Sequence, residues 1–509
     1  MAVCTCRDST PGRRIHRCST RCPAAPGNDN AVSVRDKGDF GMTIDEVKHA
    51  PTGPVLSDGT PLSELIDKDF REVSLRVLTD PELYQLELKH LFAKAWTVVA
   101  HEDEVPNVDD YVLRYVGEDQ VIVSRAADNT FTVALNVCAH RAAKVCRFEA
   151  GNAKTFQCAY HGWVYKSDGS FVGAPIARED MHGLLRPKSE LGLTQGRVET
   201  YCGMIFATFD ENAPTLREYL GPMTWYWDLM FDRTPGGMTV LGHPQRFIIK
   251  ANWKSAAEQF AGDIFHTLSL HRSMQELQLL STEGESQEPA MAGVSASHNG
   301  HFVRCFDLTN EHYVNALKGK NLADMSPMER LHLVPPPGMS PEMVDGLADR
   351  FDDGQLRILA GFTPQVGQLW PNTAALCMPF QFPDGTPSAF LSWRVWVPRG
   401  PEHFELFHWS LVERDAPAEL RDTVNLMTSA TFGISGFVEA DDTDTWPMQT
   451  YASKGALGAQ QKLRYQAITG ENKPSDWPGP AQVYAGFPKD DTQWNFWLRY
   501  SEFMEGRAW

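Results

Sequence analysis

Two short motifs constrain this chain of 509 residues more than any other feature. Cys138-Ala-His140 and Cys158-Ala-Tyr-His161 each pair one cysteine with one histidine, and residues 141–157 separate the two motifs. Thiolates and imidazoles are common metal ligands in proteins. Two loops that each supply one ligand of both kinds therefore predict a metal centre held between them.

The mixture of ligands within each loop indicates which centre this is. A Rieske cluster of two irons and two sulfides takes two thiolates on one iron and two imidazoles on the other. A structural zinc site more often takes two cysteines close together, followed by two histidines close together. Trp163, two residues after His161, can shield a cluster from water. The motifs therefore favour a Rieske [2Fe-2S] cluster over zinc.

A second pair of histidines lies in the stretch "NWKSAAEQFAGDIFHTLSLH", at His266 and His271. Residues five apart on an ideal helix are separated by about 140° around its axis, so two ligands for one metal require a π-type bulge or a break between Thr267 and Leu270. A mononuclear iron(II) that activates O2 takes two histidines and one carboxylate, which leaves positions open for oxygen and substrate. Taken alone, the two histidines fit two unrelated positions on a helix as well as they fit two ligands of one metal.

These motifs together resemble the α subunits of Rieske non-haem iron aromatic-ring-hydroxylating dioxygenases. The resemblance is closest to the biphenyl, toluene and polycyclic-hydrocarbon branches and runs from about Leu62 to the C-terminus. The stretch around His266 is similar to the family's catalytic signature, and "FGISGFVEADDTDTW" is similar to the segment that carries its third iron ligand. One departure is Ala142, where family members often have glycine. If φ is positive there, alanine costs on the order of 1 kcal/mol.

The resemblance implies a role for each matched residue. The implied cluster ligands are Cys138, His140, Cys158 and His161, and the implied iron ligands are His266, His271 and Asp442, with Asp441 as the alternative carboxylate. Asp263 would bridge the two centres by hydrogen bonds to a histidine of each, across neighbouring subunits. Gln259 would lie near an open iron position, and a structural hydrogen bond is an equal alternative.

The matched pocket positions are mostly apolar. They are Phe260, Phe432 and Val438, with a further pocket segment from Gln368 to Asn372. A site for an aromatic carboxylate would need an arginine or a cluster of donors. Because no arginine stands at the matched positions, we expect a neutral hydrocarbon as substrate.

The reaction that the resemblance implies is addition of both atoms of O2 to an arene, giving a cis-dihydrodiol. The chain has no dinucleotide-binding glycine motif after a strand, so electrons from NADH would arrive through a reductase and a ferredoxin. A small β subunit in an α3β3 assembly and a cytoplasmic location are also implied. Three alternatives stay open: a Rieske monooxygenase acting on an aromatic acid such as salicylate, a pure electron carrier, and a zinc-stabilised binding module.

Charge and pattern give the expected organisation. A net charge of −18 disfavours nucleic acid as a partner. The sequence has no run of eighteen or more apolar residues, so no membrane-spanning segment is predicted. The predicted class is α+β, with a small antiparallel β Rieske domain and a larger catalytic domain whose antiparallel sheet is flanked by helices. The expected divisions are 1–41, a disordered leader or start-site artefact; 42–95, N-terminal helices that pack on the catalytic domain; 96–208, the Rieske domain; and 209–509, the catalytic domain. Two helices are predicted between Pro61 and Trp96, the second with Thr79 or Asp80 as N-cap and Pro81 in its first turn. Further helices are predicted near 252–280, 416–432 and 455–468.

Overall fold

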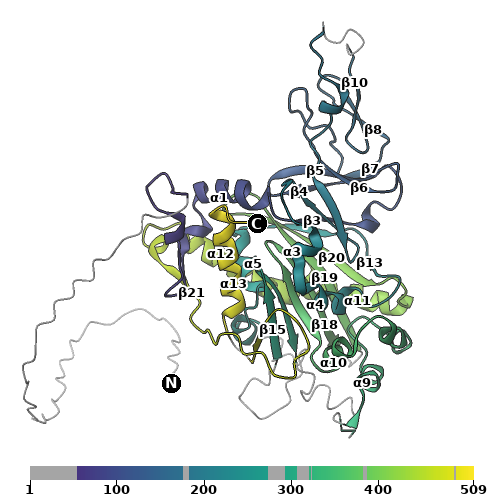
Figure 1. Ribbon diagram of the computed structural model, residues 1–509, viewed down its shortest axis with the longest axis vertical. Coiled ribbons are helices and arrows are strands. Elements are labelled where there is room, and N and C mark those ends of the chain that lie inside the picture. Colours follow the sequence, from purple (N-terminus) through teal and green to yellow (C-terminus); the bar gives the residue numbers. More distant parts are fainter. Residues whose placement is uncertain are drawn as a thin grey trace, which may run out of the picture. The chain divides into compact units, whose positions relative to one another are not determined.

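A computed structural model describes residues 54–175, 183–272, 293–306, 320–321, 324–381, 387–486 and 489–509 (Figure 1). The predicted leader, 1–41, lies outside these ranges. Small antiparallel sheets form between residues 97 and 208, and one large antiparallel sheet with helices follows. The predicted α+β class is therefore confirmed. Within the described ranges, no helix has both the length and the apolar composition needed to cross a membrane.

Three small sheets form the region of the two Cys/His motifs, and two of these sheets carry the motifs. Their strands are β6 (Phe131–Leu135), β5 (Asp119–Arg125), β4 (Asp110–Val116) and β7 (Ala150–Asn152) in one sheet; β10 (Phe171–Gly173), β9 (Val164–Lys166) and β8 (Thr155–Gln157) in the second; and β11 (Arg197–Tyr201), β12 (Met204–Thr208) and β3 (Thr97–His101) in the third. The first motif follows β6, and the second lies between β8 and β9. Both motifs therefore stand on loops, as predicted.

The large sheet has nine strands. Their order is β13 (Met238–Val240), β20 (Phe404–Glu413), β19 (Pro387–Pro398), β18 (Thr373–Gln381), β17 (Pro364–Leu369), β16 (His301–Phe306), β15 (Gly293–His298) and β22 (Gln482–Ala485), and β14 (Gln245–Ile249) also pairs with β20. Successive side chains of a strand point to opposite faces. On β19, Trp393 packs against Trp227 of α4 (Thr224–Phe231), whereas Trp396 packs against Phe260 of α5 (Trp253–Phe260). Helices α4 and α5 therefore cover opposite faces of the sheet.

Helix α5 is fixed by a buried carboxylate from the N-terminal region. Glu87, the last residue of α1 (Pro81–Glu87), accepts hydrogen bonds from Trp253 Nε1 at 3.0 Å, Lys254 Nζ at 2.6 Å and the Tyr500 hydroxyl at 2.7 Å. Tyr500 belongs to α13 (Asp491–Met504). A buried ion pair is tolerated when hydrogen bonds satisfy its remaining atoms. These contacts hold α1, α5 and α13 together, and α5 leads directly into the candidate site.

Away from the candidate site, the structure corrects two predicted helices. Of the two expected between residues 61 and 96, the second is confirmed as α1, with Asp80 as N-cap and Pro81 in the first turn. The first is wrong, because β1 (Ile66–Asp67) and β2 (Glu72–Ser74) occupy part of it. The helix expected at 455–468 is also wrong, since β21 (Lys462–Arg464) lies there and pairs with β2. Pairing between segments far apart in the sequence overrode the local pattern.

Candidate iron centres

The two Cys/His loops are near copies of each other in their backbone. In each loop the cysteine N–H donates to the carbonyl five residues later, at 2.9 Å from Cys138 and 2.8 Å from Cys158. In each loop the N–H four residues after the cysteine also donates back to the cysteine carbonyl, at 2.9 Å. Those fourth residues are Ala142, with φ of 56°, and Gly162, with φ of 71°. Two equivalent loops that each present one thiol and one imidazole suit a cluster with two irons.

The two loops bring their imidazoles together and bury their thiols. Cys138 and Cys158 are buried, and the rings of His140 and His161 lie 4.6 Å apart between centroids. His140 Nδ1 is buried and has no hydrogen-bond partner, so a metal ligand role would satisfy it. Trp163 stacks on the His140 ring at 4.9 Å, as the predicted shield would. The residues present therefore fit a [2Fe-2S] cluster.

Tyr165 is a cluster neighbour that the sequence did not single out. Its hydroxyl lies 3.2 Å from Cys138 Sγ and accepts the Ala139 N–H at 3.1 Å. Burial, followed by the contact with Cys138, raises the pKa of Tyr165. The hydroxyl therefore stays protonated and can donate to a Cys138 thiolate. Only its place on β9, directly after the second loop, could have suggested this contact.

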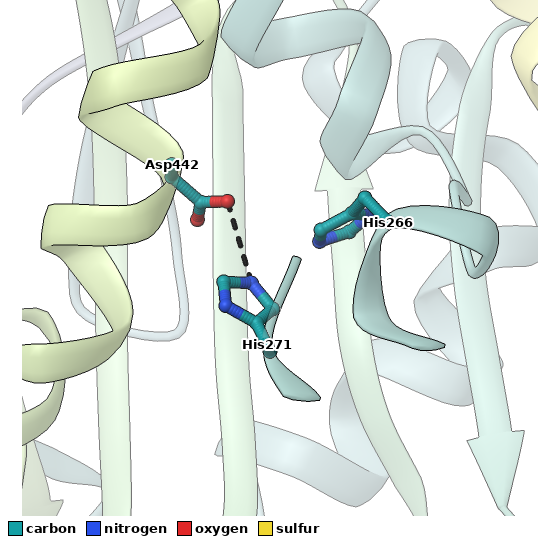
Figure 2. Close-up of side chains that lie close together, drawn as sticks. All are labelled: His266, His271 and Asp442. Carbon is teal, nitrogen blue, oxygen red and sulfur yellow. Dashed lines mark ion pairs between the residues drawn. The ribbon is translucent and has the colours of Figure 1, made fainter. Parts of the chain in front are cut away.

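The second centre is built on a broken helix. His266 lies in α6 (Phe265–Ser269), whose last backbone bond runs from Leu270 N–H to the His266 carbonyl at 2.6 Å. His271 follows the end of α6, so a break does separate the two histidines; it lies at Leu270, the C-terminal limit of the predicted interval. The break turns the two imidazole rings toward each other, with centroids 5.1 Å apart (Figure 2). The helix expected over 252–280 is divided at a second place, because Gly262, with φ of 130°, lies between α5 and α6; residues 273–280 lie outside the described part of the chain.

Asp442 comes from a different helix, α12 (Phe437–Ser453), and its carboxylate lies beside the ring of His271, with His266 nearby (Figure 2). Its Oδ1 lies 3.3 Å from His271 Nε2, and one ligand atom from each of the three residues lies within 4.8 Å of the others. Gln259 Nε2 donates to Asp442 Oδ1 at 2.8 Å, and Trp446 Nε1 donates to Gln259 Oε1 at 2.8 Å. Two imidazole nitrogens and one carboxylate are the donor set of mononuclear iron(II) oxygenases, so these residues fit that metal.

A second carboxylate lies beside the Nδ1 atom of each histidine. Asp263 Oδ2 lies 3.5 Å from His266 Nδ1, and Asp263 Oδ1 accepts the His266 backbone N–H at 3.2 Å. Asp441 Oδ2 lies 3.2 Å from His271 Nδ1. A carboxylate hydrogen-bonded at Nδ1 fixes the imidazole tautomer and leaves Nε2 for a metal, and Asp441 makes such a bond to His271. Asp441 therefore lies where it orients His271, while Asp442 lies on the Nε2 side. Asp263 lies beside His266 Nδ1 without a hydrogen bond to it.

The charges of this site are set before any metal binds. Burial alone would raise the pKa of Asp442, but hydrogen bonds and charge from His271, together with His266 and Gln259, outweigh it and hold that pKa below its usual range. Burial would lower the pKa of His271, but contacts with Asp442 and Asp441 outweigh it and raise the pKa. The buried carboxylate is thus ionised at neutral pH, which favours a divalent cation.

The predicted pocket residues gather around an arginine that the sequence did not single out. Phe260 ends α5 and Phe432 ends α11 (Ala418–Phe432), and the guanidinium carbon of Arg394 lies 5.2 Å and 4.9 Å from their ring centres. Arg394, on β19, is fully buried and forms an ion pair with Glu439, the residue after Val438. Burial raises the pKa of Glu439 to about 7; Arg394 opposes this shift and Asp442 adds to it. The sequence did not single out Arg394 because it lies far along the chain from the segments that carry the iron ligands.

Gln368, in the further predicted pocket segment, has a structural contact. Its Nε2 donates to the Ala257 carbonyl of α5 at 2.7 Å. A cavity of about 370 Å³ lies elsewhere, between residues that include Arg330, Phe362 and Trp477, and none of the predicted site residues lines it.

Comparisons with known proteins agree with this geometry. Residues 95–200 match the family model of the Rieske [2Fe-2S] domain, and residues 224–464 match that of the catalytic domain of ring-hydroxylating α subunits. The α subunit of N,N-dimethyl phenylurea N-demethylase from Sphingobium sp. (strain YBL2) is 31% identical over 90% of this chain and 96% of that protein. The biphenyl dioxygenase α subunit of Metapseudomonas furukawaii is 32% identical over 87% of this chain and 94% of that protein.

A solved structure shows the same fold. The crystal structure of naphthalene 1,2-dioxygenase from Rhodococcus sp. bound to indole matches with a TM-score of 0.75 and 33% identity, over 88% of this chain and 98% of that one. The match to an oxygenase catalytic domain removes two alternatives, the pure electron carrier and the zinc-stabilised binding module. The chain belongs to the Rieske non-haem iron ring-hydroxylating oxygenases, as an α subunit with a [2Fe-2S] domain and a non-haem iron catalytic domain.

Proposed function

We propose that this chain is the α subunit of a terminal oxygenase that adds both atoms of O2 to an aromatic hydrocarbon and gives a cis-dihydrodiol. The observation that carries the proposal is the group of His266, His271 and Asp442, whose Asp442 is hydrogen-bonded by Gln259, the residue before apolar Phe260. Three protein ligands leave the remaining positions of an octahedral iron open for oxygen and substrate. Relatives named for biphenyl and naphthalene support this substrate class.

The proposed roles of the chain's own residues follow their contacts. The loops at Cys138–His140 and Cys158–His161 would hold the cluster, and Asp263 would join His266 to a cluster histidine of a neighbouring subunit. Gln259 would hold the Asp442 carboxylate in one orientation through its 2.8 Å hydrogen bond. The bound iron would supply the activation of O2, while the protein orients its ligands and the arene.

The partners are proposed from the family. Family α subunits work with a β subunit, a ferredoxin and an NADH-dependent reductase, and we expect the same set here, in an α3β3 assembly. The proposed location is the cytoplasm. Cysteines such as Cys146, Cys305 and Cys377 are buried free thiols, which suits a reducing compartment.

Monooxygenation is the second candidate. A relative named as a phenylurea N-demethylase matches 90% of the chain, which favours oxidation of an N-methyl group as an alternative outcome. Hydroxylation of an aromatic acid such as salicylate would need an unpaired cation in the pocket. Arg394 is instead held by Glu439 in an ion pair, so its guanidinium is not free to bind a substrate carboxylate.

The decisive experiment measures oxygen incorporation. The purified α subunit is combined with its β subunit, ferredoxin and reductase under ¹⁸O₂. Separate incubations contain arenes of two to four rings, salicylate or N,N-dimethyl phenylurea. Two labelled oxygens in a dihydrodiol from an arene support the proposal. A product with one labelled oxygen, or formaldehyde released only from the phenylurea, supports monooxygenation instead. The inactive control is Asp442→Ala, which should keep the cluster spectrum.

A further inference from the structure

One cavity of the catalytic domain takes no part in the chemistry described above. Its volume is about 370 Å³, and it lies between α9 (Pro327–Leu333), α10 (Asp353–Gly361) and the paired edge strands β15 and β22. Trp477, in its wall, donates from Nε1 to the hydroxyl of Tyr226 of α4 at 2.9 Å. Helix α4 covers the opposite face of the sheet from α5, and α5 leads to the iron ligands. The cavity is therefore on the α4 side of the sheet, away from the iron ligands.

The cavity has a fixed aromatic wall. Trp477 is 7% exposed, and its ring packs edge-on against Phe362, with ring centres 5.4 Å apart. The Tyr226 hydroxyl, which accepts the Trp477 Nε1–H, donates in turn to the Pro480 carbonyl at 2.9 Å. Because the polar atom of Trp477 is bonded inside the protein, its ring gives the cavity an apolar surface. Val294 and Ile358 extend this surface. A wall of this kind suits the flat face of an aromatic ligand.

One cation in the lining is free to bind a ligand. Arg330 Nε donates to the Met325 carbonyl at 3.1 Å, and across the described residues its two terminal nitrogens have no hydrogen bond and no ion pair. The other lining arginine, Arg357, is held at the protein surface by Asp476, with Nη1 and Oδ2 3.9 Å apart. The lining thus carries a net charge of +1 in a chain of −18. A guanidinium with free terminal nitrogens suits a carboxylate, which can accept two parallel hydrogen bonds from it.

The space beside Arg330 is open because a glycine stands there. Gly361 ends α10, and a Cβ built on it would have only Arg330 Nη1 within 4 Å, at 4.0 Å. Gly361 has no positive φ, so the backbone itself does not require glycine at this position. A side chain at residue 361 would instead fill the cavity next to the guanidinium.

We propose that this cavity is a second small-molecule site and that it binds an aromatic carboxylate of one or two rings. The carboxylate would pair with Arg330, and the rings would lie against Trp477 and Phe362. Ligand pockets start at about 300 Å³, so this volume suits a small ligand. A neutral arene would leave Arg330 without a partner, and an inorganic anion would make no use of the aromatic wall. The site goes beyond the proposed oxygenation and does not depend on it.

The test is calorimetric titration of the intact oxygenase, with both iron centres loaded, by naphthoate. We expect one site per α subunit, with a dissociation constant on the order of 0.1 mM for a ligand of about thirteen non-hydrogen atoms. Naphthamide has the same rings without the charge, and inorganic phosphate has the charge without the rings. Both should bind at least about tenfold more weakly. No binding of naphthoate, or equal binding of either comparison ligand, would overturn the proposal.

Two substitutions place the probe in the cavity. Arg330→Gln removes the cation and should weaken naphthoate binding at least about tenfold. Gly361→Leu fills the space beside Arg330 and should abolish binding. Its matched control is Gly346→Leu, in the segment Pro341–Asp349, because a Cβ on Gly346 meets nothing within 4 Å and Gly346 does not line the cavity. That control should bind naphthoate like the wild type. Unchanged binding in Arg330→Gln or in Gly361→Leu contradicts the proposal, and if Arg330→Gln does not fold, the two leucine variants decide.

A further comparison separates this cavity from the iron site. Naphthoate binding should persist in an excess of the arene that the oxygenase turns over, and it should persist in Asp442→Ala. Displacement by that arene would mean that the probe binds at the iron site, and the inference would be wrong. Arg330→Gln and Gly361→Leu should keep the wild-type rate of arene turnover, and its loss in both would contradict the separation of the two sites. Failure of the oxygenation itself would appear in the ¹⁸O₂ experiment and would leave naphthoate binding unchanged.

Discussion

The backbone at Ala142 is the clearest strain in the cluster loops. Its φ of 56° is left-handed, where the equivalent residue of the other loop is Gly162. The left-handed region costs an alanine roughly 1–2 kcal/mol, and part of this is offset because alanine also restricts the unfolded chain. We therefore expect Ala142→Gly to raise the free energy of unfolding of this region by up to about 1 kcal/mol. Denaturant unfolding followed by cluster absorbance measures it.

The neighbouring residue supplies the matched control for that substitution. Ala143 lies in the same loop without a positive φ. Ala143→Gly should therefore lower stability by roughly 0.5–1 kcal/mol or more, since glycine adds freedom to the unfolded chain and removes a methyl group that packs against the neighbouring core. If both substitutions destabilise equally, the left-handed strain at Ala142 is not real.

His161 tests the assignment of the cluster ligands. His161→Ala removes one imidazole of the proposed four ligands, and its loop stands on the small sheet of β8, β9 and β10. We expect the visible Rieske absorption and the activity to disappear while the far-UV circular dichroism stays that of a folded chain. Tyr160→Ala changes the exposed neighbour and should keep the absorption. A normal cluster spectrum in His161→Ala would exclude this histidine as a ligand.

At the scale of elements, local signals predicted some helices and missed others. Asp80 as N-cap and Pro81 in the first turn predicted the start of α1, and the spacing of His266 and His271 predicted that a helix ends between them. Helix α12 was not predicted, because "EADDTDTWP" has poor helix formers and Pro447 inside the helix. It forms because Glu439, Asp442 and Trp446 are buried on one face. Arg394 was not predicted either, because its contacts form only when β19 packs against α11 and α12.

The Arg394–Glu439 pair should hold α12 in place one turn before Asp442. Arg394→Met leaves Glu439 buried without its cation, and removing one partner of such a pair costs about 3–5 kcal/mol. Removing the arginine also raises the folded-state pKa of Glu439 further, so the deficit grows as pH rises from 6 to 8. We expect loss of mononuclear iron together with the loss of stability. Iron analysis and denaturant unfolding at both pH values measure these effects.

The double variant Arg394→Met/Glu439→Gln separates the charge from the packing. It removes both charges, so most of the stability lost in Arg394→Met should return. If the double variant is as unstable as the single one, the stacking of the guanidinium on Phe260 and Phe432 matters more than the ion pair.

At the scale of the whole molecule, the region with the cluster contacts the large sheet through polar groups. Arg246 of β14 bonds to Glu149 at 2.7 Å, Trp409 of β20 donates to Glu104 at 2.9 Å, and Thr239 of β13 donates to Asp103 at 2.6 Å. The sequence predicted both regions from their motifs. These cross-contacts could not be predicted, because each joins residues more than 90 positions apart and neither partner has a local signature.

The two iron centres must exchange electrons, and Asp263 and Asp442 test that coupling as a matched pair. Asp263→Ala removes a carboxylate that contacts His266 but, in our proposal, no metal, so the cluster spectrum and much of the mononuclear iron should remain. Turnover should nevertheless fall by several orders of magnitude. Loss of histidine orientation alone costs about 10–100-fold in activity, and the broken electron path adds to it.

Asp442→Ala should instead lose the mononuclear iron and spare the cluster, because it removes a ligand. Iron per subunit, the cluster spectrum and single-turnover product distinguish the two roles. Normal turnover of Asp263→Ala with reduced ferredoxin would mean that electrons take another route.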